Sequence, residues 1–423
     1  MLNEKLKTQA SCADDFDSEA ITVTEARHRI LAKITPVSAT EKSALYQGLN
    51  RVLAQDIISA INVPGHTNSA MDGYALSADD LPQSAPNQYS VIGTAYAGRP
   101  FDGQCHAGQC IRIMTGAAMP AGTDTVIMQE HVEKASETDI RIAPGHNKYQ
   151  NVRQAGEDIA KSSIVLNQGH TIQAADLGVM ASIGIGEITV YRRPRIAFFS
   201  TGDELRPVGD TLGTGDIYDS NRYSLHGMLS QLNVETIDLG IVRDNLEDLR
   251  EALISASSTA DLVITTGGVS VGEADYVKQI VEEMGEIHFW KIAMKPGRPI
   301  TFGKLGNAAY FGLPGNPVSV MTTFYQFALP AIQRLSGQAD RTPLTIEVIC
   351  TSDLRKRAGR FECQRGILSY NESGQLTVCA TGKQGSGILT SMSRANCLIL
   401  LDEECDGIEA GDSVTVQPFS TYL

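Results

Sequence analysis

The chain has 423 residues, which corresponds to about three domains at roughly 150 residues each. Hydrophobic residues make up 42% of it, enough for several buried cores, and this excludes a largely disordered chain. The 35 Lys and Arg against 49 Asp and Glu give a net charge of −14, so the overall basic surface typical of nucleic-acid binding is absent.

The N-terminus and the cysteines indicate the compartment. Residues 1–20 are polar and acidic and lack the apolar core of a signal peptide, so we predict a flexible tail. No apolar run reaches the roughly 18 residues of a membrane helix. The 8 cysteines form no C-x-x-C pair, which predicts reduced thiols in a cytoplasmic protein. We expect neither nucleic acid nor membrane among its partners.

The first 190 residues combine two helical segments with a β-rich stretch. TVTEARHRILAKI over 22–34 predicts a helix with Thr22 or Thr24 as its N-cap, and a second helical pattern covers 173–183. Between them, a loop over 61–75 leads into short apolar pieces that alternate with Gly, Pro and Asn. That texture predicts an all-β module over 75–150.

Strand and helix patterns alternate regularly from 195 to 330, which predicts a doubly wound parallel sheet. Asp219 or Ser220 and Asn245 are suitable N-caps for two of its helices. From 341 onward, short alternating segments predict a second β module of about 80 residues, a small barrel or a sandwich.

Five turns at the strand ends of the α/β region carry glycines, carboxylates and cations. Ligands of such sheets bind beyond the carboxyl ends of the strands. Glycines let the backbone approach an anion, carboxylates suit Mg²⁺, and Lys or Arg neutralises phosphate, so the five turns together predict a site for a phosphorylated ligand with a metal. Taken singly, each turn is as easily a tight turn or a solvated charge. The candidate residues are Asp203, Glu204, Asp244, Gly267, Gly268, Ser270, Asp275, Lys291, Lys295, Arg298 and Ser319.

Other candidates lie outside this region. They are Asp72, Thr115, Arg153, Glu157 and Asp158. Local patterns favour ordinary structural roles, with Asp72 and Asp158 as turn formers or caps and Thr115 as a strand residue. In the last module, Arg360, Arg365 and Ser386 stand near glycines, where surface arginines and a turn serine are the default interpretation. The chain has no Walker loop, G-x-G-x-x-G after a strand, H-E-x-x-H or G-x-S-x-G triad. Ordinary NTPase and dinucleotide-binding functions are therefore weakly supported, and zinc protease and hydrolase functions are excluded.

A series of motifs nevertheless carries a resemblance from about residue 20 to the end. In order they are NSAMDGYA, RIMTGA, GEDI, FSTGDEL, IYDSNRY, TTGGVSVGEADY, MKPGRP and GLPGNPVS. Together they resemble the molybdopterin molybdenumtransferase family, which includes the gephyrin E domain. The resemblance implies a linking domain over 21–61 and 151–191, an inserted β module over 62–150, an α/β molybdopterin-binding domain over 192–340 and a C-terminal β module over 341–423.

The resemblance also implies an activity. Family members insert molybdenum from molybdate into adenylylated molybdopterin with Mg²⁺, and AMP leaves, as the last step of molybdenum cofactor synthesis. The family fold implies a homodimer whose cleft lies between the α/β domain of one subunit and the inserted module of the other. That cleft would bring Asp72 and Thr115 to Asp244 and Asp275. Other proteins of molybdenum cofactor synthesis are implied partners.

Individual roles follow from the same motifs. The resemblance implies that Glu204, Asp244 and Asp275 handle metal and pterin and that Lys291 and Lys295 bind the anionic substrate. It also implies functional loop positions for Arg153 and Asp158. The positions that match the family's molybdate pocket are Lys295, Ser319, Arg360 and Ser386.

Departures from the family pattern and alternative functions remain at this point. His66 and Thr67 stand where an aromatic and an acid are usual, TTGG replaces a more common T-SGG, and Arg298 stands where Lys is common. The alternatives are a molybdopterin adenylyltransferase, whose single domain resembles 192–340, a non-catalytic scaffold, and an enzyme that uses tungstate.

Overall fold

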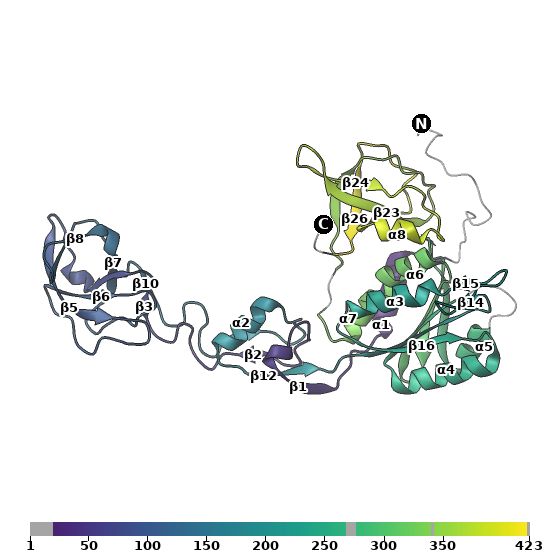
Figure 1. Ribbon diagram of the computed structural model, residues 1–423, viewed down its shortest axis with the longest axis horizontal. Coiled ribbons are helices and arrows are strands. Elements are labelled where there is room, and N and C mark those ends of the chain that lie inside the picture. The colour runs from purple at the N-terminus through teal and green to yellow at the C-terminus, as the bar shows by residue number, and fades with distance from the viewer. Residues whose placement is uncertain (1–19, 268–275, 340–341, 421–423) are drawn as a thin grey trace. The chain divides into compact units, whose positions relative to one another are not determined.

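The computed structural model describes residues 20–267, 276–339 and 342–420. The chain forms two compact units. The first unit contains the described residues up to Glu41, Asn50–Val52 and those from Tyr191 onward, and the second unit contains Lys42–Leu49 and Leu53–Val190. Figure 1 shows the chain with labels on many of its helices and strands.

The first unit is built around a six-stranded sheet of order β16-β13-β17-β21-β20-β18. Neighbours among β16, β13, β17 and β21 are parallel, which confirms the predicted doubly wound sheet. β20 runs antiparallel to both its neighbours, β18 and β21. Gly306 and Asn307 join it to β21 by a tight turn, as in a hairpin. The strands are β13 (Arg195–Thr201), β16 (Glu235–Val242), β17 (Leu262–Thr266), β18 (Gly285–Lys291), β20 (Pro299–Leu305) and β21 (Ala308–Leu313).

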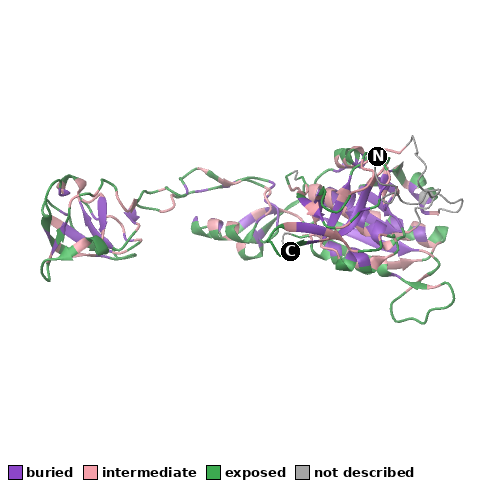
Figure 2. Ribbon diagram, turned by 90° about the horizontal axis from the view of Figure 1, so that it is seen from above, coloured by how far each residue is buried: buried purple, intermediate pink, exposed green. Residues whose placement is uncertain are grey.

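Helices cover both faces of this sheet. Residues of α1, α3, α6, η6 and α7 form one buried cluster with the strands, and residues of α4 and α5 form another. The helices are α1 (Val23–Lys33), α3 (Ser220–Ser230), α4 (Leu246–Thr259), α5 (Tyr276–Met284), α6 (Pro317–Thr323), the π-helix η6 (Phe324–Ala328) and α7 (Leu329–Leu335), and a short parallel pair joins β14 (Leu205–Arg206) and β15 (Ile217–Tyr218). Figure 2 shows buried residues concentrated on the sheet and exposed residues on the outer sides of the helices.

Thr22, Asp219 and Asn245 are confirmed as helix N-caps. The Thr22 hydroxyl accepts the Glu25 N–H at 3.2 Å, so Thr22 rather than Thr24 caps α1. The Asp219 carboxylate accepts the Arg222 N–H at 3.1 Å, and the Asn245 side chain accepts the Asp248 N–H at 3.0 Å. Each side chain satisfies one backbone donor that the first helical turn leaves open.

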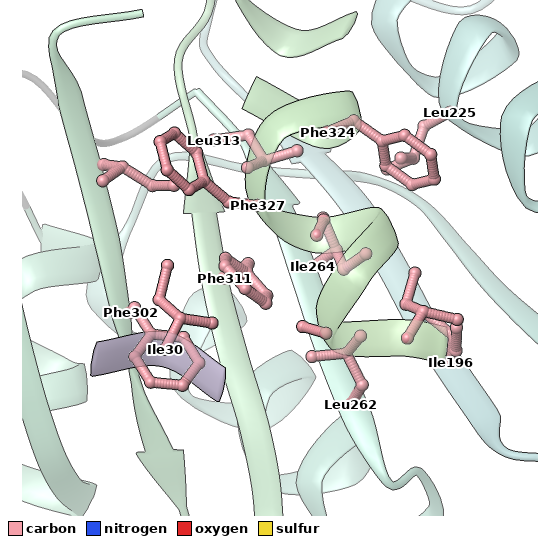
Figure 3. Close-up of a cluster of buried hydrophobic side chains, with 14 of the residues drawn as sticks. Ile30, Ile196, Leu225, Leu262, Ile264, Phe302, Phe311, Leu313, Phe324 and Phe327 are labelled. Atoms are coloured by element: carbon pink, nitrogen blue, oxygen red, sulfur yellow. The ribbon is translucent and has the colours of Figure 1, made fainter. Parts of the chain in front are cut away.

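The helix α1 contributes Val23, Ala26 and Ile30 to the core of the α/β sheet. Figure 3 shows Ile30 beside Phe302 and Phe311 in this core. The segment 21–61, predicted as part of a linking domain, therefore contains a helix that packs with the α/β region. The domain boundaries themselves stay a prediction.

The C-terminal module of the first unit is a closed five-stranded barrel, which decides between the barrel and the sandwich. β23 pairs with both β24 and β25, and the order β23-β24-β22-β26-β25 returns to β23. The short strand β19 (Met294–Lys295) joins the edge of β23, with Met294 opposite Phe361. The barrel elements are β22 (Ile346–Cys350), β23 (Phe361–Tyr370), β24 (Leu376–Ala380), α8 (Leu389–Arg394), β25 (Cys397–Leu401) and β26 (Ser413–Pro418).

The second unit contains the predicted inserted β module, a six-stranded sheet of order β7-β4-β6-β5-β9-β8. Its strands are β4 (Gly73–Leu76), β5 (Asn87–Ala95), β6 (Gln109–Ile113), β7 (Thr125–Met128), β8 (Val132–Lys134) and β9 (Asp139–Ile142). The remaining elements are β1 (Thr40–Ala44), η3 (Leu45–Gln47), β2 (Ile57–Ile58), β3 (Asn68–Ser69), η4 (Ala78–Asp80), η5 (Gln129–His131), β10 (Val152–Arg153), β11 (Ile164–Leu166), α2 (Ala174–Ser182) and β12 (Glu187–Tyr191). The helix α2 confirms the helical pattern predicted at 173–183.

Among the described residues, no helix combines the length and the apolar character needed to cross a membrane.

We predict that Phe311→Ala lowers the free energy of unfolding of the first unit by about 3–5 kcal/mol, because Phe311 is fully buried between strand and helix neighbours. Denaturant unfolding measures the change. Tyr370→Ala is the control, since that aromatic is 66% exposed and its loss should leave stability nearly unchanged. Equal effects of the two substitutions would contradict the packing described above.

Candidate functional site

The carboxyl ends of the parallel strands lie side by side at one edge of the sheet. Thr201 at the end of β13 is opposite Val242 of β16, and Thr266 at the end of β17 is opposite Leu313 of β21. The segments that leave these strands therefore begin next to one another, as the sequence predicts. They carry Asp203 and Glu204, Asp244, Gly267, and the turn 314–316.

Carboxylates gather at this edge. Burial raises the pKa of Asp244 above its ordinary value, and the negative charges of Asp203 and Glu204 raise it further. The charge effect shows that the three side chains lie close enough to repel one another. Within the described ranges, no three His, Cys, Asp or Glu side chains are grouped so that they could hold a metal by themselves. The predicted candidates Gly268, Ser270 and Asp275 lie outside the described residues.

The backbone is crowded beside this acidic edge. Gly267 has φ +85°, and a Cβ there would lie 2.2 Å from the carbonyl oxygen of Thr201, so only glycine fits. A Cβ on Gly315 would lie 4.0 Å from the Gly267 Cα, and the Asn221 side-chain amide donates to the Gly315 carbonyl at 2.7 Å. The ends of β13 and β17, the turn 314–316 and the start of α3 thus meet around these two glycines.

Two residues of the predicted anion pocket, Ser319 and Ser386, are brought together at the start of α6. Ser319 lies in α6 and is 4% exposed. The backbone N–H of Val318 donates to the Ser386 carbonyl at 3.1 Å, which fixes the Ser386 loop beside α6. Lys295 lies in β19, and its Nζ is 3.4 Å from a carboxylate oxygen of Glu362 on β23. Arg360 immediately precedes β23, and exposed Lys291 ends β18.

Arg365 corrects one sequence-based interpretation. It is not a surface arginine in a turn: it lies in the middle of β23 and is 1% exposed. Its Nε donates to the Ser391 hydroxyl at 3.0 Å and its guanidinium to the Gly385 carbonyl at 3.1 Å, one residue before Ser386. Burial lowers its pKa to about 10, while the charge of nearby Glu362 opposes this shift. Arg365 therefore remains a cation at neutral pH, with mostly neutral hydrogen-bond partners.

Asp72 and Thr115 form a hydrogen-bonded pair in the second unit. One carboxylate oxygen of Asp72 accepts the Thr115 N–H at 2.7 Å and the Thr115 hydroxyl at 2.8 Å. These bonds lower the pKa of Asp72, the backbone bond most strongly. Pairing of β4 with β6, which sets Gly73 opposite Ile113, places the two loops together. Thr115 follows β6, so the interpretation as a strand residue is wrong.

Arg153 lies in β10, and Asp158 lies in the loop that follows this strand. Arg153 lies opposite Asn68 in the β3–β10 pair, and the Asp158 N–H donates to the Val63 carbonyl at 3.0 Å. The Ala70 N–H donates to the Asn151 carbonyl at 2.9 Å, which ties this pair to the loop before Asp72. Both Arg153 and Asp158 are exposed and available to a ligand.

Family models match nearly all of the chain. The model of the MoeA N-terminal region (domain I and II) matches residues 21–184, the probable molybdopterin binding domain matches 197–334, and the MoeA C-terminal region (domain IV) matches 347–419.

Relatives match over most of this chain as well. A molybdopterin molybdenumtransferase of Haemophilus influenzae is 45% identical over 95% of this chain and 100% of its own. Gephyrin of Dictyostelium discoideum is 32% identical over 88% of this chain and 58% of its own. The crystal structure of a molybdopterin biosynthesis moeA protein from Pyrococcus horikoshii has a TM-score of 0.83 at 28% identity, covering 95% of this chain and 100% of that one. These matches confirm the resemblance carried by the sequence motifs.

We predict that Asp203→Asn lowers the pKa of Asp244 toward its ordinary value, because one of its two negative neighbours is removed while its burial remains. A raised carboxyl pKa in the folded state means that this group destabilises the fold as pH rises through that pKa, so the variant should also be more stable at neutral pH. NMR titration of the Asp244 carboxyl measures the shift. Glu251→Gln, on exposed α4 surface, is the control, and an unchanged Asp244 titration in Asp203→Asn would contradict the acidic cluster.

Proposed function

Since this chain belongs to the molybdopterin molybdenumtransferase family, we propose that it inserts molybdenum from molybdate into adenylylated molybdopterin, with release of AMP, as the last step of molybdenum cofactor synthesis. One observation carries the proposal. The acidic edge of the sheet and the start of α6, where the Ser386 loop is bonded, both adjoin the carboxyl ends of the parallel strands, since α6 begins four residues after β21 ends. This arrangement supports a site for a phosphorylated pterin beside a site for an oxyanion.

The pocket around Arg365 suits molybdate. Lys295, Arg360 and Arg365 with Glu362 combine three cations and one carboxylate, a net charge of +2 that balances a dianion. Ser319 and Ser386 add hydroxyl donors. Hydrogen bonds from charged donors to an oxyanion are stronger than those from neutral donors, and they strengthen further when water is excluded. Burial of Arg365 and Ser319 provides such exclusion on the protein side.

The acidic edge suits Mg²⁺. This ion usually keeps several waters and binds through one or two carboxylates together with substrate phosphates, so a complete cage of protein ligands is not required. Glu204 and Asp244 are the described residues that would hold it, and Asp275 is proposed as a third ligand from its motif. The ion would offset negative charge on the phosphoryl oxygens of the pyrophosphate linkage. The surroundings of Asp244 support this role: burial and the charges of Asp203 and Glu204 raise its pKa, and a bound cation would offset both effects.

The remaining residues position the substrate. Lys291 and Lys295 are proposed to neutralise substrate anions, and the backbone around Gly267 gives a close approach to the phosphates. Asp72 is proposed to act across a homodimer, held in its ionised form by Thr115. Arg153 and Asp158 are proposed to bind substrate from the same second unit. Other proteins of molybdenum cofactor synthesis are the proposed partners. A cytoplasmic location is part of the proposal, supported by free thiols at all seven described cysteines.

We predict that Asp244→Asn reduces AMP release from adenylylated molybdopterin by at least about 100-fold, because a ligand of the charge-stabilising cation loses its charge. The assay measures AMP with Mg²⁺ and with or without molybdate. Asp210→Asn, an exposed carboxylate of the same unit, is the control and should retain full activity. Light scattering should show an unchanged oligomer.

Other results would redirect the proposal. Normal turnover by Asp244→Asn would remove its metal role. Pterin binding without AMP release by the wild type would favour the scaffold, and synthesis of adenylylated pterin from ATP would favour the adenylyltransferase. Equal or better use of tungstate would make tungstate, rather than molybdate, the proposed oxyanion substrate.

We predict that Arg365→Met raises the molybdate concentration for half-maximal AMP release by at least about 10-fold, since a lost charged hydrogen bond is worth roughly 1.5–3 kcal/mol. Arg365→Lys should have an intermediate effect, because it keeps the charge but not both donors toward Ser391 and Gly385. Arg394→Met, exposed on α8, is the control. The binding of adenylylated molybdopterin should not change in any of the three variants. An unaltered molybdate dependence of Arg365→Met would exclude Arg365 from the pocket.

A further inference from the structure

Three oxygen atoms near the start of α3 and the end of β13 are buried without a hydrogen-bond partner in the protein. They are Thr201 Oγ1, Asp219 Oδ2 and Asn221 Oδ1. Thr201 is 3% and Asp219 2% exposed. An unpaired buried polar atom costs roughly 1–3 kcal/mol, so folded proteins seldom retain one without a function. Here three such atoms come from residues that meet at one edge of the sheet.

Other atoms of these residues already make contacts within the protein. The second carboxylate oxygen of Asp219 accepts the Arg222 N–H and caps α3. The amide nitrogen of Asn221 donates to the Gly315 carbonyl, and the Thr201 carbonyl lies against Gly267. Because Gly267 also approaches Gly315, Thr201 and Asn221 are linked through one set of contacts, and Asp219 stands two residues before Asn221. The unpaired oxygens of Asp219 and Asn221 therefore cannot turn to find partners without breaking these bonds.

The chemistry of the three atoms selects the ligand. A carboxylate oxygen and a side-chain amide oxygen only accept hydrogen bonds, and a hydroxyl can do both. Phosphate and molybdate present acceptors and would be repelled. Among the parts of the proposed substrate, the aminopyrimidinone edge of the pterin presents an amino group and a ring N–H side by side, whereas the adenine presents an amino group alone.

We propose that Thr201, Asp219 and Asn221 bind the aminopyrimidinone edge of the pterin; this inference rests on the proposed function and adds the subsite that orients the substrate. The amino group and the adjacent ring N–H donate to Asp219 Oδ2 and Asn221 Oδ1, and Thr201 Oγ1 completes the set. In the free protein these unpaired oxygens are destabilising. Hydrogen bonds from the bound substrate offset that free-energy cost.

Asp219→Asn tests the proposal with little change of shape. Asparagine is an equally good N-cap, and its oxygen must face the Arg222 N–H to serve as one. Its NH₂ group then occupies the position of the unpaired oxygen, so a donor meets a donor. We expect the Kd for adenylylated molybdopterin, measured by pterin fluorescence, to rise about 10- to 100-fold, with the Kd for AMP alone unchanged.

Thr201→Val and Thr265→Val form a matched pair. Both threonines are buried at adjacent strands β13 and β17, but the Thr265 hydroxyl is already bonded to the Tyr310 hydroxyl at 2.8 Å. Thr201→Val removes an unpaired hydroxyl, so it should raise the melting temperature and weaken binding of adenylylated molybdopterin several-fold. Thr265→Val removes a paired hydroxyl, so it should lower the melting temperature and leave the Kd unchanged.

Several results would overturn the subsite. Unchanged binding of adenylylated molybdopterin by Asp219→Asn and Thr201→Val would do so, as would an equal loss of affinity for AMP. Wild-type binding that depends on Na⁺ or K⁺ would assign the oxygens to a cation instead. If the wild type itself fails to bind adenylylated molybdopterin, the proposed function fails. If the wild type binds and the two variants bind equally well, only the subsite fails.

Discussion

Parallel pairing of β16, β13, β17 and β21 is the constraint on which the candidate site depends. The register of these pairs sets the carboxyl ends of the four strands side by side at one edge. Side chains far apart in the chain thereby share one electrostatic environment, which the pKa of Asp244 reports. A shift of β16 by one residue relative to β13 would separate Asp244 from Glu204 and turn the strand's side chains to the other face.

The second requirement is a firm contact between the barrel and the α/β sheet. Parallel pairing of β19 with β23 sets Lys295 opposite Glu362. On the other side, Arg27 of α1 donates to Gln326 of η6 at 2.7 Å, and Gln326 donates to Gln417 of β26 at 2.8 Å. The π-helical turn of η6 carries this buried polar chain, and π-turns inside helices are often found near functional sites. The position of Arg365 relative to Ser319 follows from these contacts.

Features that depend on a local pattern of residues could be predicted from the sequence. The regular alternation of strand and helix patterns along the chain predicted the doubly wound sheet. Asp219 and Asn245, polar residues that precede apolar stretches, predicted two helix N-caps. Strand-end residues such as Glu204 and Asp244 could be grouped because parallel strands end at one edge. Arg365 could not be placed, since β23 is buried on both faces and has no alternation to reveal an inward-facing arginine. Its partners Ser391 and Gly385, and the unpaired oxygen of Asp219, depend on tertiary contacts that carry no local signal.

The distribution of the first unit along the chain has a consequence for its synthesis. The helix α1 packs against elements that follow it only after the entire second unit, and Arg27 bonds to a residue 299 positions later. At roughly 5–20 residues per second, a ribosome needs about 15–60 s to produce that partner. During this time the apolar side of α1 has no sheet to cover it, while the second unit is complete and able to fold. The emerging chain therefore exposes an unprotected hydrophobic segment, and molecular chaperones are suited to shield it until the sheet is made.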